Sequence, residues 1–371
     1  IGELTMKKFF KSQPVLVISF IAAAVTMLFI HPDKQYIGYI NKTVLIQLFS
    51  LMMAVAGLRS VGIFNKATSF LLRKTGSVRR LGLVFVLLCC FSAMFVTNDV
   101  ALLTFVPLTL LVYDKINDEK SRIMTIVLET CAANAGSMLT PIGNPQNLFV
   151  YDEYKLSMVD FLRTLLPAGA VSMIVICLLT LLLPNTPCTA SETKDTNIPK
   201  VPTMGYCALF VVCLLTVLRF IPDYICLGAA VLTALLFNRK LLLKVDYSLL
   251  ATFVCFFVFV GNIARIGAVS DFFSGILAGR ELIVTALLSQ VISNVPAAVM
   301  LSGFTDNGTQ LILGADIGGF GTLIASLASL ISFQIYRKAD NAQAFKYFCV
   351  FSTINFALLI LLILIHKFLI V

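Results

Sequence analysis

Long apolar blocks recur along the chain, and they constrain its fold more than any other feature. The clearest blocks are Val15 to Ile30, Met204 to Leu218, Tyr224 to Phe237, Leu249 to Val260 and Phe348 to Ile365. Their lengths are comparable with the ~20 residues that a helix needs to cross the hydrocarbon core of a bilayer. Because hydrocarbon offers no partner for backbone N–H and C=O groups, such segments must be helical. We therefore expect an all-α integral membrane protein with the lipid bilayer as its solvent.

Composition agrees with this class and argues against others. Of the 371 residues, 59% are hydrophobic and only 13% are charged, whereas about a quarter are charged in soluble domains. The net charge of +9 does not form a patch, since the charges lie in loops between the apolar blocks. This distribution is typical of membrane topology and does not indicate a nucleic-acid partner. The ten cysteines show no C-x-x-C spacing, so we predict no metal centre and no cofactor.

Loop charges predict the topology. Lys7, Lys8 and Lys11 precede the first apolar block, and the loop at 151–160 is net acidic. Further basic residues cluster in four stretches: 59–80, 115–122, 239–244 and 337–346. Because Lys and Arg accumulate on the cytoplasmic side, we place the N-terminus inside and the C-terminus outside, with about nine spanning helices. Two apolar segments, 81–113 and 281–304, must then enter and leave on the same side as re-entrant hairpins.

The two halves of the chain resemble each other in order. We predict an N-terminal span and external loop at 1–42, a first repeat at 43–183, a cytoplasmic linker at 184–202 and a second repeat at 203–371. In the first repeat, hairpin 81–113 precedes a broken helix at 123–150. In the second, hairpin 281–304 precedes a broken helix at 309–335. The first hairpin opens from the cytoplasm and the second from outside, so the repeats are inverted, which is a recurrent transporter design.

Polar residues at the hairpin tips and helix breaks are the candidate site. An irregular backbone at membrane depth survives only against protein or water, and helix N-termini there favour anions. The predicted substrate-binding residues are Thr97, Asn98, Asp99, Asn134, Thr140, Gly143, Asn144, Ser293, Asn294, Val295, Gly318, Gly319 and Thr322. Intramembrane acids are functional candidates, so the predicted coupling-ion residues are Asn98, Asp99, Glu129, Gly143, Asn294 and Asp316.

Three stretches resemble the ion transporter superfamily, which includes divalent anion/sodium symporters, citrate–metal symporters, arsenite efflux permeases and some sodium/proton antiporters. These stretches are Thr97 to Leu103, Thr140 to Asn147 and Ser293 to Pro296. The chain looks most similar to the citrate-transporter-like branch. The resemblance implies a homodimer, in which a static scaffold supports a moving transport unit that works as an elevator.

The same resemblance implies roles at the tips. In the dicarboxylate members both tips read Ser-Asn-Thr and touch substrate carboxylates and sodium. Asn98 and Asn294 match the middle position, whereas Asp99 and Val295 depart from the third. This departure favours a metal-complexed, singly charged or neutral oxyanion-type substrate, with proton coupling through Asp99.

The leading interpretation is secondary transport of a small anion, a carboxylate or an inorganic oxyanion, coupled to sodium or protons. The compact, loop-poor form indicates a bacterial or archaeal plasma membrane. Arsenite-type efflux, a channel, and cation/proton antiport at Asp99 and Asp316 stay open as alternatives. A receptor that binds solute without moving it would also carry these breaks. An intramembrane enzyme is the other non-transporter alternative, but the only two histidines, His31 and His366, lie at membrane borders, and no catalytic motif is present.

Overall fold

The structure describes residues 14–63, 75–187 and 198–367. Within these ranges the secondary structure is helical, apart from one isolated β-bridge between Ser77 and Pro187. In this computed structural model six helices are long and apolar enough to cross a membrane. They are α4 (Lys42–Ser60), α6 (Val78–Val96), α10 with its 3-10 extension η1 (Met158–Leu182), α11 (Lys200–Val217), α13 (Tyr247–Ala264) and α19 (Ala344–Ile365). Two shorter apolar helices, α2 (Pro14–Phe29) and α12 (Asp223–Phe237), bring further apolar segments. The chain is a multi-pass, all-α membrane protein.

Both predicted hairpins are present, and each turns on one residue. The first consists of α6 and α7 (Asn98–Ile116), which Thr97 alone separates. The second consists of α15 (Glu281–Ile292) and α16 (Asn294–Ser302), which Ser293 alone separates. A turn this tight brings the end of one helix directly onto the start of the next.

Both predicted broken helices are also present. In the first half, α8 (Glu119–Ser137) and α9 (Pro145–Glu153) are separated by residues 138–144. Pro145 occupies the first turn of α9, where a missing N–H costs nothing and the fixed φ suits a helix. In the second half, α17 (Gly308–Gly318) and α18 (Leu327–Arg337) are separated by residues 319–326. Each hairpin packs against the first part of the broken helix that follows it, α6 on α8 and α15 on α17.

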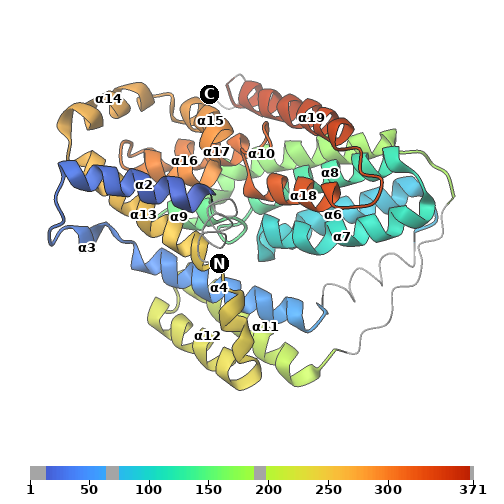
Figure 1. Ribbon diagram of the computed structural model, residues 1–371, viewed down its shortest axis with the longest axis horizontal. Helices are drawn as coiled ribbons and strands as arrows, with labels where there is room; N and C mark the ends of the chain where they lie inside the picture. Colours follow the sequence, from blue (N-terminus) through green and yellow to red (C-terminus); the bar gives the residue numbers. More distant parts are fainter. Residues whose placement is uncertain (1–13, 64–74, 188–197, 368–371) are drawn as a thin grey trace, which may run out of the picture.

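Contacts between the two halves are reciprocal. Helix α2 packs against α13 of the second half, and α12 packs against α4 of the first half. In the same way, α18 packs against α7, and α9 packs against α16. Figure 1 shows α2 lying alongside α13, and α11 and α12 below α4. Reciprocal contacts of this kind are expected when two copies of one motif are intertwined, and they support the predicted repeat.

Three smaller helices complete the described part of the chain. The short helix α3 (Tyr36–Tyr39) follows α2, and the 3-10 helix η2 (Arg239–Lys244) follows α12. Helix α14 (Gly267–Leu277) follows α13 and meets α15 at an angle of 109°. Lys7, Lys8 and Lys11, which the topology prediction uses, lie outside the described residues.

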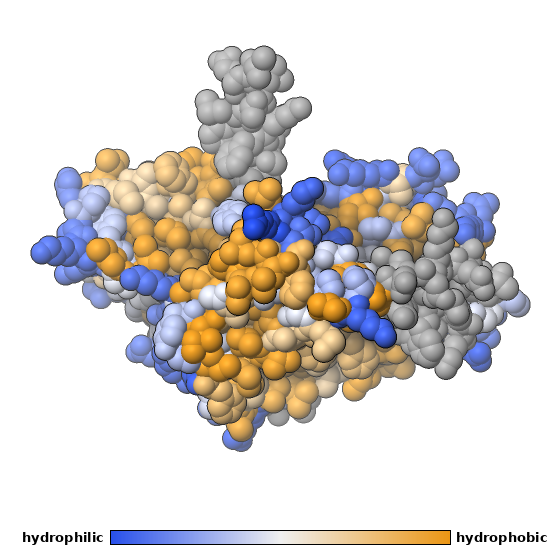
Figure 2. Space-filling view, turned by 90° about the horizontal axis from the view of Figure 1, so that it is seen from below, coloured by the Kyte–Doolittle hydropathy of each residue, from blue (hydrophilic) through white to orange (hydrophobic). Residues whose placement is uncertain are grey.

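The outer surface of the helices is apolar. Exposed side chains include Val211 of α11, Leu232 and Leu236 of α12, Leu178 of α10 and Ile360 of α19. In Figure 2, which views the molecule from below, hydrophobic residues cover a broad part of the surface, with hydrophilic residues at its edges and near its middle. In water such a surface would be unstable, whereas in a bilayer it is the expected lipid-facing surface.

Candidate functional site

The two hairpin tips share an unusual backbone conformation. Thr97 has φ 73° and ψ 151°, and Ser293 has φ 78° and ψ 154°. This region of the Ramachandran plot is occupied almost only by glycine, and a residue with a Cβ pays about 1–3 kcal/mol to adopt it. The same strain at equivalent positions of both halves marks the tips as specialised points of the fold.

The asparagine that follows each tip residue binds its own helix start in the same way. Asn98 Oδ1 accepts from the backbone N–H of Asp99 at 2.9 Å, and Asn294 Oδ1 accepts from that of Val295 at 3.0 Å. Both asparagines are buried. The carboxylate of Asp99 accepts from the Thr97 hydroxyl at 2.5 Å, a bond for which Val295 has no equivalent. The tips therefore differ in charge but not in backbone geometry.

A threonine from each helix break holds the tip in front of it. The hydroxyl of Thr140 donates to the carbonyl of Met94, and that of Thr322 donates to the carbonyl of Gln290 at 2.9 Å. Both carbonyls belong to the last turn before a tip residue. These two predicted residues therefore have a structural role in both halves.

Asn134 joins the two halves at the centre of the molecule. Its Oδ1 accepts from Asn98 at 3.0 Å and from Ser326 at 3.2 Å. Its Nδ2 donates to the carbonyl of Gly319 at 3.2 Å and to Ser329 at 3.5 Å. Asn134 is thus fully hydrogen-bonded, and it ties the first tip to the second broken helix.

Asp316 makes the corresponding contact from the second half to the first. Its Oδ1 accepts from Gln146 Nε2 of α9 at 3.0 Å, and the side chain is buried. Asn144, which was predicted, lies near the same carboxylate and donates to the hydroxyl of Ser137 at 2.8 Å. A polar residue of α8 therefore binds the start of α18, and a polar residue of α17 binds the start of α9.

Glycines of the breaks allow close backbone approach. A Cβ on Gly143 would lie 2.1 Å from the carbonyl oxygen of Ser137, and one on Gly318 would lie 2.8 Å from the Cα of Ala286. At Gly319 the nearest atom would be Asn294 Nδ2, at 3.1 Å. At these predicted positions a side chain would clash with the backbone or side chains of the neighbouring segments.

Glu129 lies apart from the other predicted residues. It is fully buried on α8, where one carboxylate oxygen accepts from Thr109 of α7 at 2.6 Å. The rest of the predicted set is connected through Asn98, Asn134, Asn294 and Asp316, and Glu129 has no hydrogen bond to any of them among the described residues.

Two glutamines connect the site but were not among the predicted residues. Gln290 donates to the carbonyls of Gly318 and Phe320 and accepts from the N–H of Thr322, so it fastens the second hairpin to the second break. Gln146 binds Asp316 across the halves. Gln290 is a lone amide in an apolar helix, three residues before a tip. This position is the feature of the sequence that could have identified Gln290 as part of the site.

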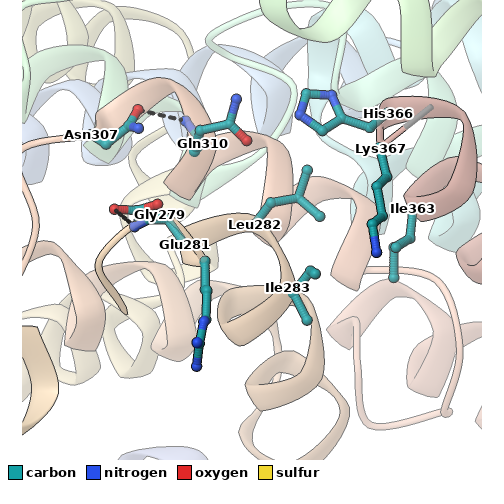
Figure 3. Close-up of a pocket in the computed structure, with 10 residues that line it drawn as sticks. Gly279, Glu281, Leu282, Ile283, Asn307, Gln310, Ile363, His366 and Lys367 are labelled. Carbon is teal, nitrogen blue, oxygen red and sulfur yellow. Dashed lines mark hydrogen bonds between the residues drawn. The ribbon is translucent and has the colours of Figure 1, made fainter. Parts of the chain in front are cut away.

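The cavity of about 370 Å³ lies away from these residues, at the start of α15 and α17 and the end of α19. Figure 3 shows Gln310, His366 and Lys367 among the side chains around it. The candidate site itself is a closed, hydrogen-bonded cluster, in which Asn98, Asn134, Asn294 and Asp316 are all buried.

An apolar helical bundle with two hairpins and two broken helices, whose polar ends meet inside it, defines a membrane transport protein. The model of the citrate transporter family (CitMHS) matches residues 6–307. The chain belongs to this family.

Similar chains are known from both archaea and bacteria. The chain is 33% identical over 296 residues to the uncharacterized transporter MJ0456 of Methanocaldococcus jannaschii, covering 78% of this chain and 79% of that one. It is 31% identical over 306 residues to the inner membrane protein YbiR of Escherichia coli, covering 81% and 82%. A shorter match of 180 residues, 32% identical, covers 46% of this chain and 36% of the silicon efflux transporter LSI3 of Oryza sativa subsp. japonica.

Proposed function

We propose that this chain is a secondary active transporter of a small anion, a carboxylate or an inorganic oxyanion, coupled to sodium or to protons. Its substrate site is the cluster of hairpin tips and helix breaks. The family, described as citrate transporters, supports an anionic substrate.

One observation carries this proposal: four helices, α7, α9, α16 and α18, begin at the cluster. No charged residue occupies the N-cap of any of these four helices. At the two tips, the neutral side chains of Asn98 and Asn294 each accept from one first-turn N–H. The positive dipole ends of the four helices therefore keep their charge, which favours an anion.

The cluster also brings these four starts together. The N–H of Asn294 at the start of α16 donates to the carbonyl of Ala325 beside the start of α18, at 2.9 Å. Asn134 links the starts of α7 and α18, and Gln146 at the start of α9 reaches Asp316. Several half-dipoles that point at one centre favour negative charge there more than a single helix end does.

The test is uptake into proteoliposomes that contain the purified chain. Citrate, succinate, sulfate, phosphate and arsenite would be offered with an inward sodium gradient, with an inward proton gradient, and with neither. We expect gradient-dependent accumulation of one anion. Accumulation of none of them, with sodium/proton exchange instead, would replace this proposal with the cation antiporter.

Variants at the tips test the site. Asn98→Ala and Asn294→Ala should each reduce uptake at least about tenfold, since each removes a buried hydrogen-bonding group worth about 1–3 kcal/mol. Asn355→Ala is the matched control, because Asn355 is a buried membrane asparagine of α19 that donates to Phe351 of its own helix and belongs to neither tip nor break. Unaltered uptake in both tip variants would refute the site.

A second candidate is efflux of a weak oxyacid. Asp99 adds a negative charge at the first tip, which opposes a dianion and favours a neutral or singly charged solute. The partial similarity to a plant silicon efflux transporter points the same way. Export from cells loaded with arsenite or silicic acid distinguishes this candidate from uptake of a carboxylate.

The setting of the site leads to further proposals. Helices α4, α11, α12 and α13 with α2 form a scaffold, and the hairpins and broken helices form a unit that moves as an elevator in a homodimer. We place the chain in the plasma membrane, with its N-terminus cytoplasmic and its C-terminus external. Labelling of single cysteines introduced at 155 and 240 from either side would check the orientation, since the topology predicted from loop charges puts these two positions on opposite sides.

A further inference from the structure

The two halves differ in one titratable group at the centre of the site. Asn134 and Asp316 lie at equivalent positions, each six residues before the threonine that anchors a tip. Both are buried, with 4% and 3% of their surface exposed, and both face the start of the second broken-helix segment of the other half. An amide and a carboxyl have the same shape, so what distinguishes these positions is the ability to hold a proton.

The hydrogen bonds of the two residues also differ. Asn134 uses both its oxygen and its nitrogen fully. Asp316 Oδ1 accepts from Gln146, but its Oδ2 has no hydrogen-bond partner within the part of the chain that the structure describes. A buried acceptor without a donor costs about 1–3 kcal/mol, and more if it is charged. The surroundings of Asp316 therefore lack one hydrogen-bond donor.

A second acceptor without a partner lies in the same surroundings. The side chains of Gln146, Asn147 and Asn144 all lie around the carboxyl group of Asp316. Among described atoms, Asn147 Oδ1 is likewise buried and unpaired, while its Nδ2 donates to the carbonyls of Ser137 and Thr140. A proton on Asp316 Oδ2 would convert one of these two acceptors into a donor.

The side chains that face the carboxyl group of Asp316 are neutral. The start of α9 contributes the three amides, α15 contributes Ser289 beside Gly318, and α16 contributes Asn294 beside Gly319. Helices α10 and α19 meet α17 at Leu313 and Ile317, where the titratable His366 lies beside these two apolar side chains. The carboxyl group of Asp316 itself interacts with the three amides among the described residues. An unpaired carboxylate in such surroundings costs several kcal/mol.

We propose that Asp316 carries the coupling proton, and that the closed, solute-loaded site requires this residue to be protonated. This inference rests on the proposed transport function and names its coupling ion. When the loaded site opens, Asp316–COOH loses its proton to water and becomes a carboxylate that water solvates. The empty unit returns with this carboxylate hydrated, so each cycle moves one proton with the solute and carries none back.

Gln146 gives this proton a mechanical role. Its bond to Asp316 joins α9 of the first half to α17 of the second, beside Gly318 and Gly319, against which the second hairpin packs. A neutral carboxyl keeps this bond in the closed form. A hydrated carboxylate would separate the two segments, because water must enter between them.

The test compares Asp316→Asn with the wild-type protein in proteoliposomes. Asparagine mimics the protonated acid and already stands at the equivalent position 134, so the fold should tolerate it. We expect proton-driven accumulation, which in the wild type reaches about tenfold per pH unit for one proton, to fall to the equilibrium ratio. Exchange of internal for external solute should stay within about twofold of wild type, because exchange needs no change of protonation.

Glu129→Gln is the control, since Glu129 is a fully buried acid of α8 that lies outside the cluster. Proton-driven accumulation that persists in Asp316→Asn and disappears in Glu129→Gln would overturn the assignment. Accumulation driven by sodium alone in the wild type, without proton movement, would also overturn it. If the wild type moved no anion at all, the transport proposal itself would fail, which is a distinguishable result.

Discussion

Glycine at the second hairpin tip should give a more stable protein than alanine, whereas inside a helix alanine is normally the more stable of the two. Ser293 has φ 78° and ψ 154°, a conformation that costs a residue with a Cβ about 1–3 kcal/mol. Glycine escapes that cost but loses about 0.5–1 kcal/mol more conformational entropy than alanine on folding. Ser293→Gly should therefore be more stable than Ser293→Ala by about 0.5–2 kcal/mol. The hydroxyl is absent from both variants, so its weak bonds cancel.

Ser289, four residues earlier on α15, provides the internal control. Its backbone is helical and its side chain is buried. There Ser289→Ala should be more stable than Ser289→Gly by about 1 kcal/mol. The free energy of unfolding would be measured for all four variants by denaturant titration in the same detergent micelles. Alanine more stable than glycine at both positions would show that the tip is not strained, and would remove the backbone argument for a specialised tip.

Three further outcomes are expected. Gly136→Ala should lower the thermal stability of the purified protein, because the new Cβ would lie 2.2 Å from a backbone carbonyl of the first hairpin, whereas Gly228→Ala has open space and should not. Thr322→Val should speed amide hydrogen exchange at the second tip, since it removes a hydroxyl bond of 2.9 Å that holds this tip. The ion pair of 2.9 Å with Arg265 lowers the pKa of exposed Asp33. Arg265→Ala should then cost stability near pH 7 but not once the pH falls below the folded pKa of Asp33, as a melting series across pH would show.

The sequence predicted the hairpins and breaks because their signals are local. Polar residues and glycines interrupt apolar blocks at 97–99, 134–145, 293–296 and 316–322, and the structure places its helix ends at these points. The boundaries of the two repeats and the roles of the site residues stay predictions.

The rest depends on contacts between distant segments. Neither Thr97 nor Ser293 signals a positive φ, since both residue types normally avoid it. The crossing of Asn134 to Ser326 and of Gln146 to Asp316 joins residues more than 150 positions apart. No periodicity within one segment carries that information. For the same reason, the sequence grouped Glu129 with the coupling residues, although its bonds lie within the first hairpin and α8.

The exchange of helices between the halves has a consequence for biosynthesis. Helix α2 precedes the first half in the chain, but the helix that it packs against, α13, is made only after that half and the α11–α12 pair. Helix α4 likewise waits for α12. During synthesis the first half therefore enters the membrane before the helices that pack against it are made, and its inner surfaces face lipid until then. Neither half is a folding unit, so the chain acquires its native packing late, and an interrupted translation product should be a substrate for membrane proteases.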